Sequence, residues 1–204
     1  LDVDRGDKLL FGNGFGSSSG KASLFIVETS TGKLLKEITT DSSTNNGLGG
    51  VRLVQNSQKQ IIGAYAGDLL GRLWKFDLSG ASSIAWQLGN GGTALFTATK
   101  DGTPLPITAQ PAVMERTDQA AFNPSYLVSF GTGKLFEVGD ANITTPTQHA
   151  YAIWDRRLFG SSTSDSVSDA SLEELKVKKV DIGAGSGDSL NSGGVTSFYT
   201  VEFA

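Results

Sequence analysis

AYAGDLLGRLWKFDLSG, at residues 64–80, contains two strand-like runs joined by a short polar turn. In the second run, residues 72–78, large side chains alternate with polar ones, as in a strand that lies within a sheet. Trp74, Phe76 and Leu78 fall on the same face of this strand. The pattern therefore predicts a β-sheet with one bulky buried side and one polar side.

The turn between the two runs holds the residues expected to form a structural motif. An Asp side chain accepts hydrogen bonds from turn amides, and Gly adopts positive φ, so Asp68 and Gly71 are expected to shape this turn. Trp74 is expected to pack between neighbouring sheets and to bury about 200 Å² of mostly apolar surface. Trp86 and Trp154 are expected to pack in the same way. The predicted motif consists of Gly67, Asp68, Gly71, Trp74 and Asp77.

A strand that ends in a Ser/Thr-Gly turn occurs at 24–33, again at 73–80, and in weaker form at 129–137. The first two copies begin about 50 residues apart, and a propeller blade of four antiparallel strands uses roughly 40–50 residues. The repeat predicts an all-β fold, a partial β-propeller ring of about four blades. A β-sandwich is the structural alternative, but sandwich strands rarely repeat a turn motif at this spacing.

Strand-like runs recur along the whole chain. They lie at residues 8–12, 22–29, 33–39, 51–54, 61–66, 71–78, 94–99, 112–115, 125–130, 134–138, 149–154 and 197–203. A single short helix is expected at 171–176, because Ser171 and Glu174 have the spacing of a capping box.

Composition excludes some function classes. The 204 residues have a net charge of −4 and contain no cysteine. Without a basic stripe, a nucleic-acid partner is not expected. The sequence has no apolar run of 18 residues, so a membrane-spanning helix is not expected. The first residues start in mid-pattern, as if cut from a longer precursor.

The sequence offers few candidates for catalysis. His149 is the only histidine, and no second His or Cys is present to share a metal ion, so a structural or surface role is expected. No G-x-S-x-G motif singles out a nucleophile. Gly131-Thr-Gly-Lys134 resembles part of a phosphate loop, but an apolar run follows it, which favours a turn. We therefore expect no catalytic or cofactor-binding residues.

Five segments in a fixed order resemble the C-terminal β-propeller domain of the PilC/PilY family of type IV pilus proteins. They are FGNGFGSSSGKASLFIVETSTGKLLKEI (11–38), AYAGDLLGRLWKFDLSG (64–80), LFTATKDGTPLPITAQPAV (95–113), LVSFGTGKLFEVGD (127–140) and HAYAIWD (149–155). The resemblance implies that residues 1–204 are part of a single propeller domain, without the N-terminal region that the family carries.

The resemblance also implies a function. Family members are secreted proteins of the pilus tip or outer cell surface that support pilus assembly against retraction, twitching motility and adhesion. The expected partners are minor pilins at the pilus tip and a receptor on a host or abiotic surface. Loops usually carry the function of such folds, so the loops at 14–20, 39–50 and 160–168 are the expected contact sites.

One segment departs from the family pattern. Many members carry a calcium loop just before the AYAGD segment, and calcium needs six to eight oxygen ligands, several of them charged. The matching residues 55–63 contain no carboxylate, and Lys59 adds a positive charge. Asp68 is the only acid left nearby, so we expect no calcium here.

A quinoprotein-like propeller is the functional alternative. The turns at 28–33 and 77–80 resemble the blade ends of pyrroloquinoline quinone dehydrogenases. Those enzymes also need a calcium site, an Asp base and residues that hold the cofactor, and this sequence shows none in recognisable form. Its likeness is therefore to the scaffold, and binding without catalysis is the favoured interpretation.

Overall fold

The computed structural model describes residues 7–118, 121, 124–141, 147–165, 167–168, 172, 175–181 and 197–203. Strands dominate these residues, and the helical segments among them are short 3₁₀ turns: η1 (Ser83–Ala85), η2 (Asn90–Gly92) and η4 (Val138–Ala141). The chain divides into two units, Leu1–Asp169 and Ala170–Ala204. The predicted all-β fold is confirmed.

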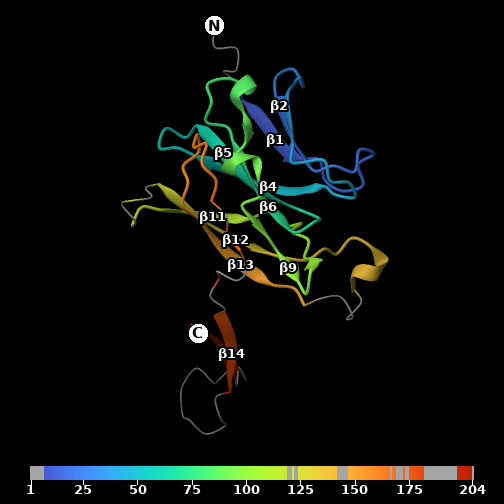
Figure 1. Ribbon diagram of the computed structural model, residues 1–204, viewed down its shortest axis with the longest axis vertical. Helices are drawn as coiled ribbons and strands as arrows, with labels where there is room; N and C mark the ends of the chain where they lie inside the picture. Colours follow the sequence, from blue (N-terminus) through green and yellow to red (C-terminus); the bar gives the residue numbers. More distant parts are fainter. Residues whose placement is uncertain are drawn as a thin grey trace. The chain divides into compact units, whose positions relative to one another are not determined.

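Three antiparallel sheets build the first unit (Figure 1). The first sheet has the order β1 (Lys8–Gly12), β2 (Ser23–Glu28), β3 (Leu34–Thr39). The second has the order β4 (Leu48–Gln55), β5 (Ile61–Asp68), β6 (Arg72–Asp77), β7 (Gln87–Leu88), and β8 (Phe96–Thr97) also pairs with β6. The third has the order β11 (Ala112–Arg116), β12 (Ser125–Gly131), β13 (Ala150–Asp155). Between the last two sheets in sequence, β9 (Thr99–Lys100) and β10 (Thr103–Pro104) form a two-stranded ribbon.

The first strands of the three sheets lie next to one another. β4 packs beside β1 and also beside β11, and each sheet then continues outward through its later strands. Sheets that radiate from a common inner set of strands are the arrangement of propeller blades. The inner position of β1, β4 and β11 leaves β3, β7 and β13 at the outer edges.

One apolar cluster joins the first two sheets. Its fully buried members include Leu24 and Ile26 from the first sheet and Phe76 from the second. Trp74 and Trp86, which are 3% and 8% exposed, belong to the same cluster, as expected for residues that pack between sheets. This cluster fixes the two sheets against each other by the burial of large apolar surfaces.

The prediction that the β6 strand buries only one side is wrong. On the side opposite Trp74, Leu73 is fully buried, and Lys75 and Asp77 are only 2% and 8% exposed. Lys75 is covered because its ammonium group pairs with Asp155 at the end of β13 in the third sheet. Both faces of this strand are therefore interior.

The second unit contains one hairpin. β14 (Leu175–Asp181) and β15 (Ser197–Phe203) pair in antiparallel register, with Leu175 opposite Phe203 and Asp181 opposite Ser197. The predicted helix at 171–176 is wrong at its end, because residues 175 and 176 begin a strand whose backbone groups pair with β15. Residues 171, 173 and 174 of that prediction lie outside the described residues.

Candidate functional site

The turn between β5 and β6 is organised by the carboxylate of Asp68, which is fully buried. Its Oδ1 accepts hydrogen bonds from the backbone N–H groups of Leu70 and Arg72, both at 2.9 Å. Its Oδ2 accepts from the indole Nε1 of Trp74, also at 2.9 Å. Gly71 occupies the turn with φ of 75°. A buried carboxylate with this many donors is satisfied, and it holds the turn in a single conformation.

The same carboxylate also ties down the loop at 39–50. Asn46 Nδ2 donates to Asp68 Oδ2 at 2.9 Å, and Asn46 Oδ1 accepts from the backbone N–H of Leu69 at 3.0 Å. Arg72 donates to Asp68 through Nε and to Asp41 through its terminal nitrogens. This loop, one of the predicted contact sites, is therefore anchored to the β5–β6 turn.

The pKa of Asp41 reflects this anchoring. Partial burial alone would raise the pKa of this carboxyl, but the hydrogen bonds from Arg72 and from the backbone and hydroxyl of Ser43 outweigh burial and hold the pKa below its ordinary value. The carboxylate is therefore charged at neutral pH, which keeps the link between Asp41 and Arg72 intact.

Gly67 and Asp77 lie at the other two positions of the predicted motif. A Cβ atom added to Gly67 would lie 2.2 Å from Ile107 Cγ2, so only glycine leaves room for the close approach of that chain. Asp77 Oδ1 accepts from the backbone N–H and the hydroxyl of Ser79, at 3.1 and 2.6 Å. All five motif residues thus lie along β5, β6 and their turns, and their contacts are structural.

A buried polar cluster connects the second and third sheets. Lys75 Nζ lies 2.7 Å from Asp155 Oδ2, and Tyr65 donates its hydroxyl to the same oxygen at 2.6 Å. Lys75 also donates to the carbonyl of Arg157 and lies 4.5 Å from the ring centroid of Phe159. Burial, followed by the charge of Asp155, raises the pKa of Tyr65 well above its ordinary value, so Tyr65 remains a donor. We call Tyr65, Lys75 and Asp155 the inter-sheet lock, because their contacts hold the second and third sheets together.

The segment compared with a calcium loop forms a closed turn. Asn56 Oδ1 accepts from the backbone N–H groups of Gln58 and Gln60, and Asn56 Nδ2 donates to Gln60 Oε1 at 2.9 Å. Asp68 is not part of this turn, because it ends β5 whereas the turn precedes Ile61, about 23 Å away along the strand. Asp68 is thus separated from the turn by the length of β5, and the residues at 55–63, which have no carboxylate, do not fit the ion.

Two loops that are far apart in the sequence meet through aromatic rings. Phe15, in the predicted contact loop at 14–20, stacks on Phe136 with ring centroids 4.7 Å apart. Beside them, Leu135 is 77% exposed and Val138 is fully exposed. We call this set, Phe15, Leu135, Phe136 and Val138, the apolar loop surface.

The predicted strand at 134–138 is wrong. Asp140 Oδ2 accepts from the backbone N–H groups of Phe136 and Glu137, at 3.0 and 2.8 Å, and these N–H groups are then not available to a strand partner. Lys134 pairs with Asp140 at 3.0 Å and also with Glu137. The loop is therefore folded on itself, and its apolar side chains point outward because its polar ones are paired.

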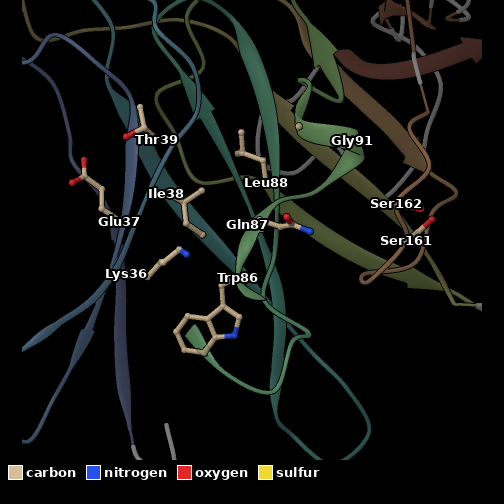
Figure 2. A pocket seen from close by; sticks show the side chains of 11 residues that line it. Lys36, Glu37, Ile38, Thr39, Trp86, Gln87, Leu88, Gly91, Ser161 and Ser162 are labelled. Carbon is tan, nitrogen blue, oxygen red and sulfur yellow. The ribbon is translucent and has the colours of Figure 1, made fainter. Parts of the chain in front are cut away.

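The third predicted contact loop, at 160–168, lines an open groove. Arg156 pairs with Asp165 through Nε at 2.8 Å, and the backbone N–H of Asp165 donates to Asn90 Oδ1 at 2.6 Å. These bonds hold Ser161 and Ser162 opposite β3, across a groove of about 550 Å³ that β3, residues 86–88 and the glycines at 91 and 92 complete (Figure 2).

The remaining sequence candidates have structural surroundings. The backbone N–H of His149 donates to Thr132 Oγ1 at 2.8 Å, and its ring stacks on Tyr151 with the ring centroids 5.9 Å apart. Trp154 is half-buried rather than packed in the core, with the Arg116 guanidinium 4.6 Å from its ring. Within the described residues, no three His, Cys, Asp or Glu side chains group as a metal site.

Sequence reasoning missed the polar residues that connect the sheets. Asp155, Lys75 and Asn46 were not singled out, although a signal for Asp155 exists. The run AYAIWD at 150–155 resembles AYAGD at 64–68, and both strands end in an Asp whose Oδ1 accepts from the backbone N–H two residues later. The repeat of a strand-ending acid marks both positions.

Comparison with known proteins identifies similar domains. A family model described as the PilY1 beta-propeller domain matches residues 9–186. The type IV pilus biogenesis factor PilY1 of Pseudomonas aeruginosa (strain UCBPP-PA14) is 34% identical over 178 residues, which cover 75% of this chain. A type IV pilus biogenesis factor PilY1 homolog of Xylella fastidiosa (strain Temecula1) is 32% identical over 171 residues, or 72% of this chain.

A solved structure is also similar. The crystal structure of the Pseudomonas aeruginosa PilY1 C-terminal domain superposes with a TM-score of 0.77 and 26% sequence identity, covering 97% of this chain and 42% of that one. The matched part makes up 15% of the Pseudomonas protein and 11% of the Xylella protein. The chain thus corresponds to a small part of these relatives.

Proposed function

Because this chain belongs to the PilY1 β-propeller domain family, we propose that it is the propeller module of a type IV pilus biogenesis protein and that it acts by binding. The family match over residues 9–186 carries this proposal, and the relatives named above are pilus biogenesis factors. In this function the module supports pilus assembly against retraction and mediates adhesion at the cell surface or pilus tip. Its partners are minor pilins and a surface receptor, and nucleic acid is not among them.

The apolar loop surface is the best candidate for the contact with these partners. Exposed apolar side chains on a folded loop lose little conformational entropy on binding, because the loop is already ordered. The ion pairs of Lys134 with Glu137 and Asp140 supply that order here. A cluster of this kind is typical of a protein interaction site rather than of a solvated surface.

The surroundings of the buried polar clusters support a function in binding rather than in catalysis. The polar clusters around Asp68 and Asp155 are buried and satisfied by neighbouring residues, so they support the scaffold and do not face a substrate. No helix in the described part of the chain is long and apolar enough to cross a membrane. The quinone-dependent alternative is tested separately, by the absorbance of purified protein with added quinone and by an alcohol dehydrogenase assay.

The test places substitutions in the full-length protein at its chromosomal locus. The double variant Leu135→Ser with Val138→Ser removes exposed apolar side chains without changing charge, and Ile84→Ser, at a residue that is 88% exposed elsewhere, is the matched control. Surface pili per cell and attachment per pilus are counted, with and without the retraction motor. We expect the double variant to lower one of these counts by about tenfold, as for the loss of an interface hot spot.

The two counts, each made with and without the retraction motor, separate the components of the function. A loss of pili that disappears without the retraction motor supports a role against retraction, and a loss of attachment at normal pilus number supports adhesion. If the double variant and Ile84→Ser both behave as the wild type, the apolar loop surface is not the contact site. If deletion of the whole module leaves pili and attachment unchanged, the pilus function itself is refuted.

A further inference from the structure

The first sheet has an open outer edge. Within the described residues, β3 pairs with β2 alone, whereas the second sheet continues past its third strand into β7. A propeller blade typically contains four strands. The first sheet is therefore one strand short of its neighbour, at the position beyond β3.

The backbone of β3 presents hydrogen-bonding groups at this edge. The backbone N–H of Thr40 donates to the carbonyl of Ala22 in the direction of β2, at 3.0 Å. In an antiparallel pair the direction of the backbone N–H and C=O groups alternates from residue to residue. The backbone groups of Ile38 therefore also point toward β2, while those of Glu37 and Thr39 point outward. The N–H and C=O groups of these two residues point away from the sheet, as in strands that accept a partner strand.

The groove described above runs along this edge, and both charged and apolar side chains line it. Lys36 and Ile38 project into the space between β3 and residues 86–92, while Glu37 points away from them (Figure 2). Ile38 and Trp86 are almost fully buried and form an apolar wall with Leu88. The opposite wall leaves open space at Gly92, because a Cβ added there would meet no atom within 4 Å.

We propose that β3 accepts an extended segment of a partner polypeptide as a fourth, antiparallel strand of the first blade. The outward groups of Glu37 supply main-chain hydrogen bonds, and the groove takes alternate side chains of the segment. An apolar side chain fits opposite Ile38, and an acidic one fits opposite Lys36, whose charge is the only positive one that lines the groove in the described residues. This inference does not depend on the pilus function, because it concerns only the edge and its groove.

A short labelled peptide tests the proposal directly. The probe is fluorescein-Ser-Thr-Val-Thr-Glu-Thr-Ser, in which Val is placed opposite Ile38 and Glu opposite Lys36 when the central Thr pairs with Glu37. The control peptide is N-methylated at the central Thr and cannot donate to β3. Fluorescence polarisation with protein at concentrations up to about 1 mM detects even weak peptide recognition. We expect saturable binding of the probe and at least about tenfold weaker binding of the control.

Two substitutions at one residue separate the backbone from the side chain. Glu37→Pro removes an outward N–H, which an edge strand tolerates, while Glu37→Ala keeps it. We expect Glu37→Pro to weaken the probe by about tenfold and Glu37→Ala by less than about twofold. Ser162→Trp, on the opposite wall, fills the groove without touching β3 and is expected to weaken the probe as well.

The outcomes decide the proposal. Circular dichroism and thermal melting establish that each variant is folded, and Ser162→Trp provides the test if Glu37→Pro is not. Absence of probe binding to the wild type, or equal binding by Glu37→Pro and Glu37→Ala, overturns the proposal. Sedimentation that shows a wild-type dimer, converted to a monomer by Glu37→Pro, also overturns it, because the occupant is then a second copy of the chain.

Discussion

A single substitution, Asp155→Asn, removes the ion pair of the inter-sheet lock between the second and third sheets. Asp155→Asn preserves the shape of the side chain but removes its charge, and Lys75 is then left without its carboxylate partner in a site where both side chains are at most 2% exposed. The ammonium group retains the carbonyl oxygens of Arg157 and Leu158, at 2.5 and 3.4 Å. These acceptors reduce the cost of the change but do not neutralise the charge.

The expected loss of stability follows from this burial. Removing one member of a buried ion pair typically costs about 3–5 kcal/mol, whereas an exposed pair contributes roughly 1 kcal/mol or less. Because two carbonyl acceptors remain, we expect Asp155→Asn to lower the free energy of unfolding by about 3 kcal/mol. With a urea dependence of about 2 kcal/mol per molar, the unfolding midpoint falls by about 1.5 M.

The assay is urea unfolding at pH 7, followed by tryptophan fluorescence. Asp118→Asn is the matched control, since its partner Arg116 forms an exposed ion pair with it. The double variant Lys75→Met with Asp155→Asn removes both charges and is expected to recover about 1–2 kcal/mol of the loss. If Asp155→Asn costs no more than the control, the lock does not stabilise the contact between the sheets and the reasoning fails.

Three further predictions concern the motif, pH and calcium. In Gly67→Ala the new Cβ would lie 2.2 Å from Ile107 Cγ2, so we expect a loss of about 1–3 kcal/mol in urea unfolding, against almost none for Gly131→Ala, which has no neighbour within 4 Å. The pKa of Tyr65 is raised by burial above its ordinary value of 10.0, so its contribution to stability is complete below pH 10 and is lost as the pH rises further. Urea unfolding above pH 10 is therefore expected to show a shallower pH dependence in Tyr65→Phe than in the wild type, and equal slopes would contradict this. Calorimetric titration with calcium is expected to show no sub-millimolar binding, and binding that Asn56→Ala abolishes would refute the assignment.

Alternation and turn chemistry were sufficient to predict much of the fold. Lys8–Gly12 and Ser197–Phe203 were predicted with the bounds that the structure has, and the strands around the β5–β6 turn within a few residues. These strands have clear period-two patterns or glycine-containing turns beside them, so local sequence carries the information. The two-residue strands β7, β9 and β10 are too short to show a period, and they were missed.

The wrong predictions share one physical cause. In each case a residue outside the local pattern, either a few positions away or far along the chain, decides the local structure. The apolar run at 134–138 resembles a strand, but Asp140 captures two of its N–H groups. Lys75 was placed on a polar face because the sequence does not reveal that Asp155, 80 positions later, covers it. The groove beside β3 was equally invisible, since it depends on where three separate segments come together.

One kind of hydrogen-bonding pattern, made by aspartate side chains, links the strands to the loops that surround them. In Asp41, Asp68 and Asp155, Oδ1 accepts from the backbone N–H two residues later, while Oδ2 bonds to a side chain from another segment. The first bond fixes a turn, and the second fixes that turn relative to a neighbouring strand or sheet. Because Asn46 and Arg72 join two of these turns, the loop between the first and second blades is held in place before any partner arrives. Ordering a loop costs roughly 1–2 kcal/mol per residue in backbone entropy, so a loop fixed in this way binds more tightly with the same contacts. In the proposed binding function, the carboxylates of Asp41 and Asp68 therefore contribute by ordering this loop and not by contact with the partner.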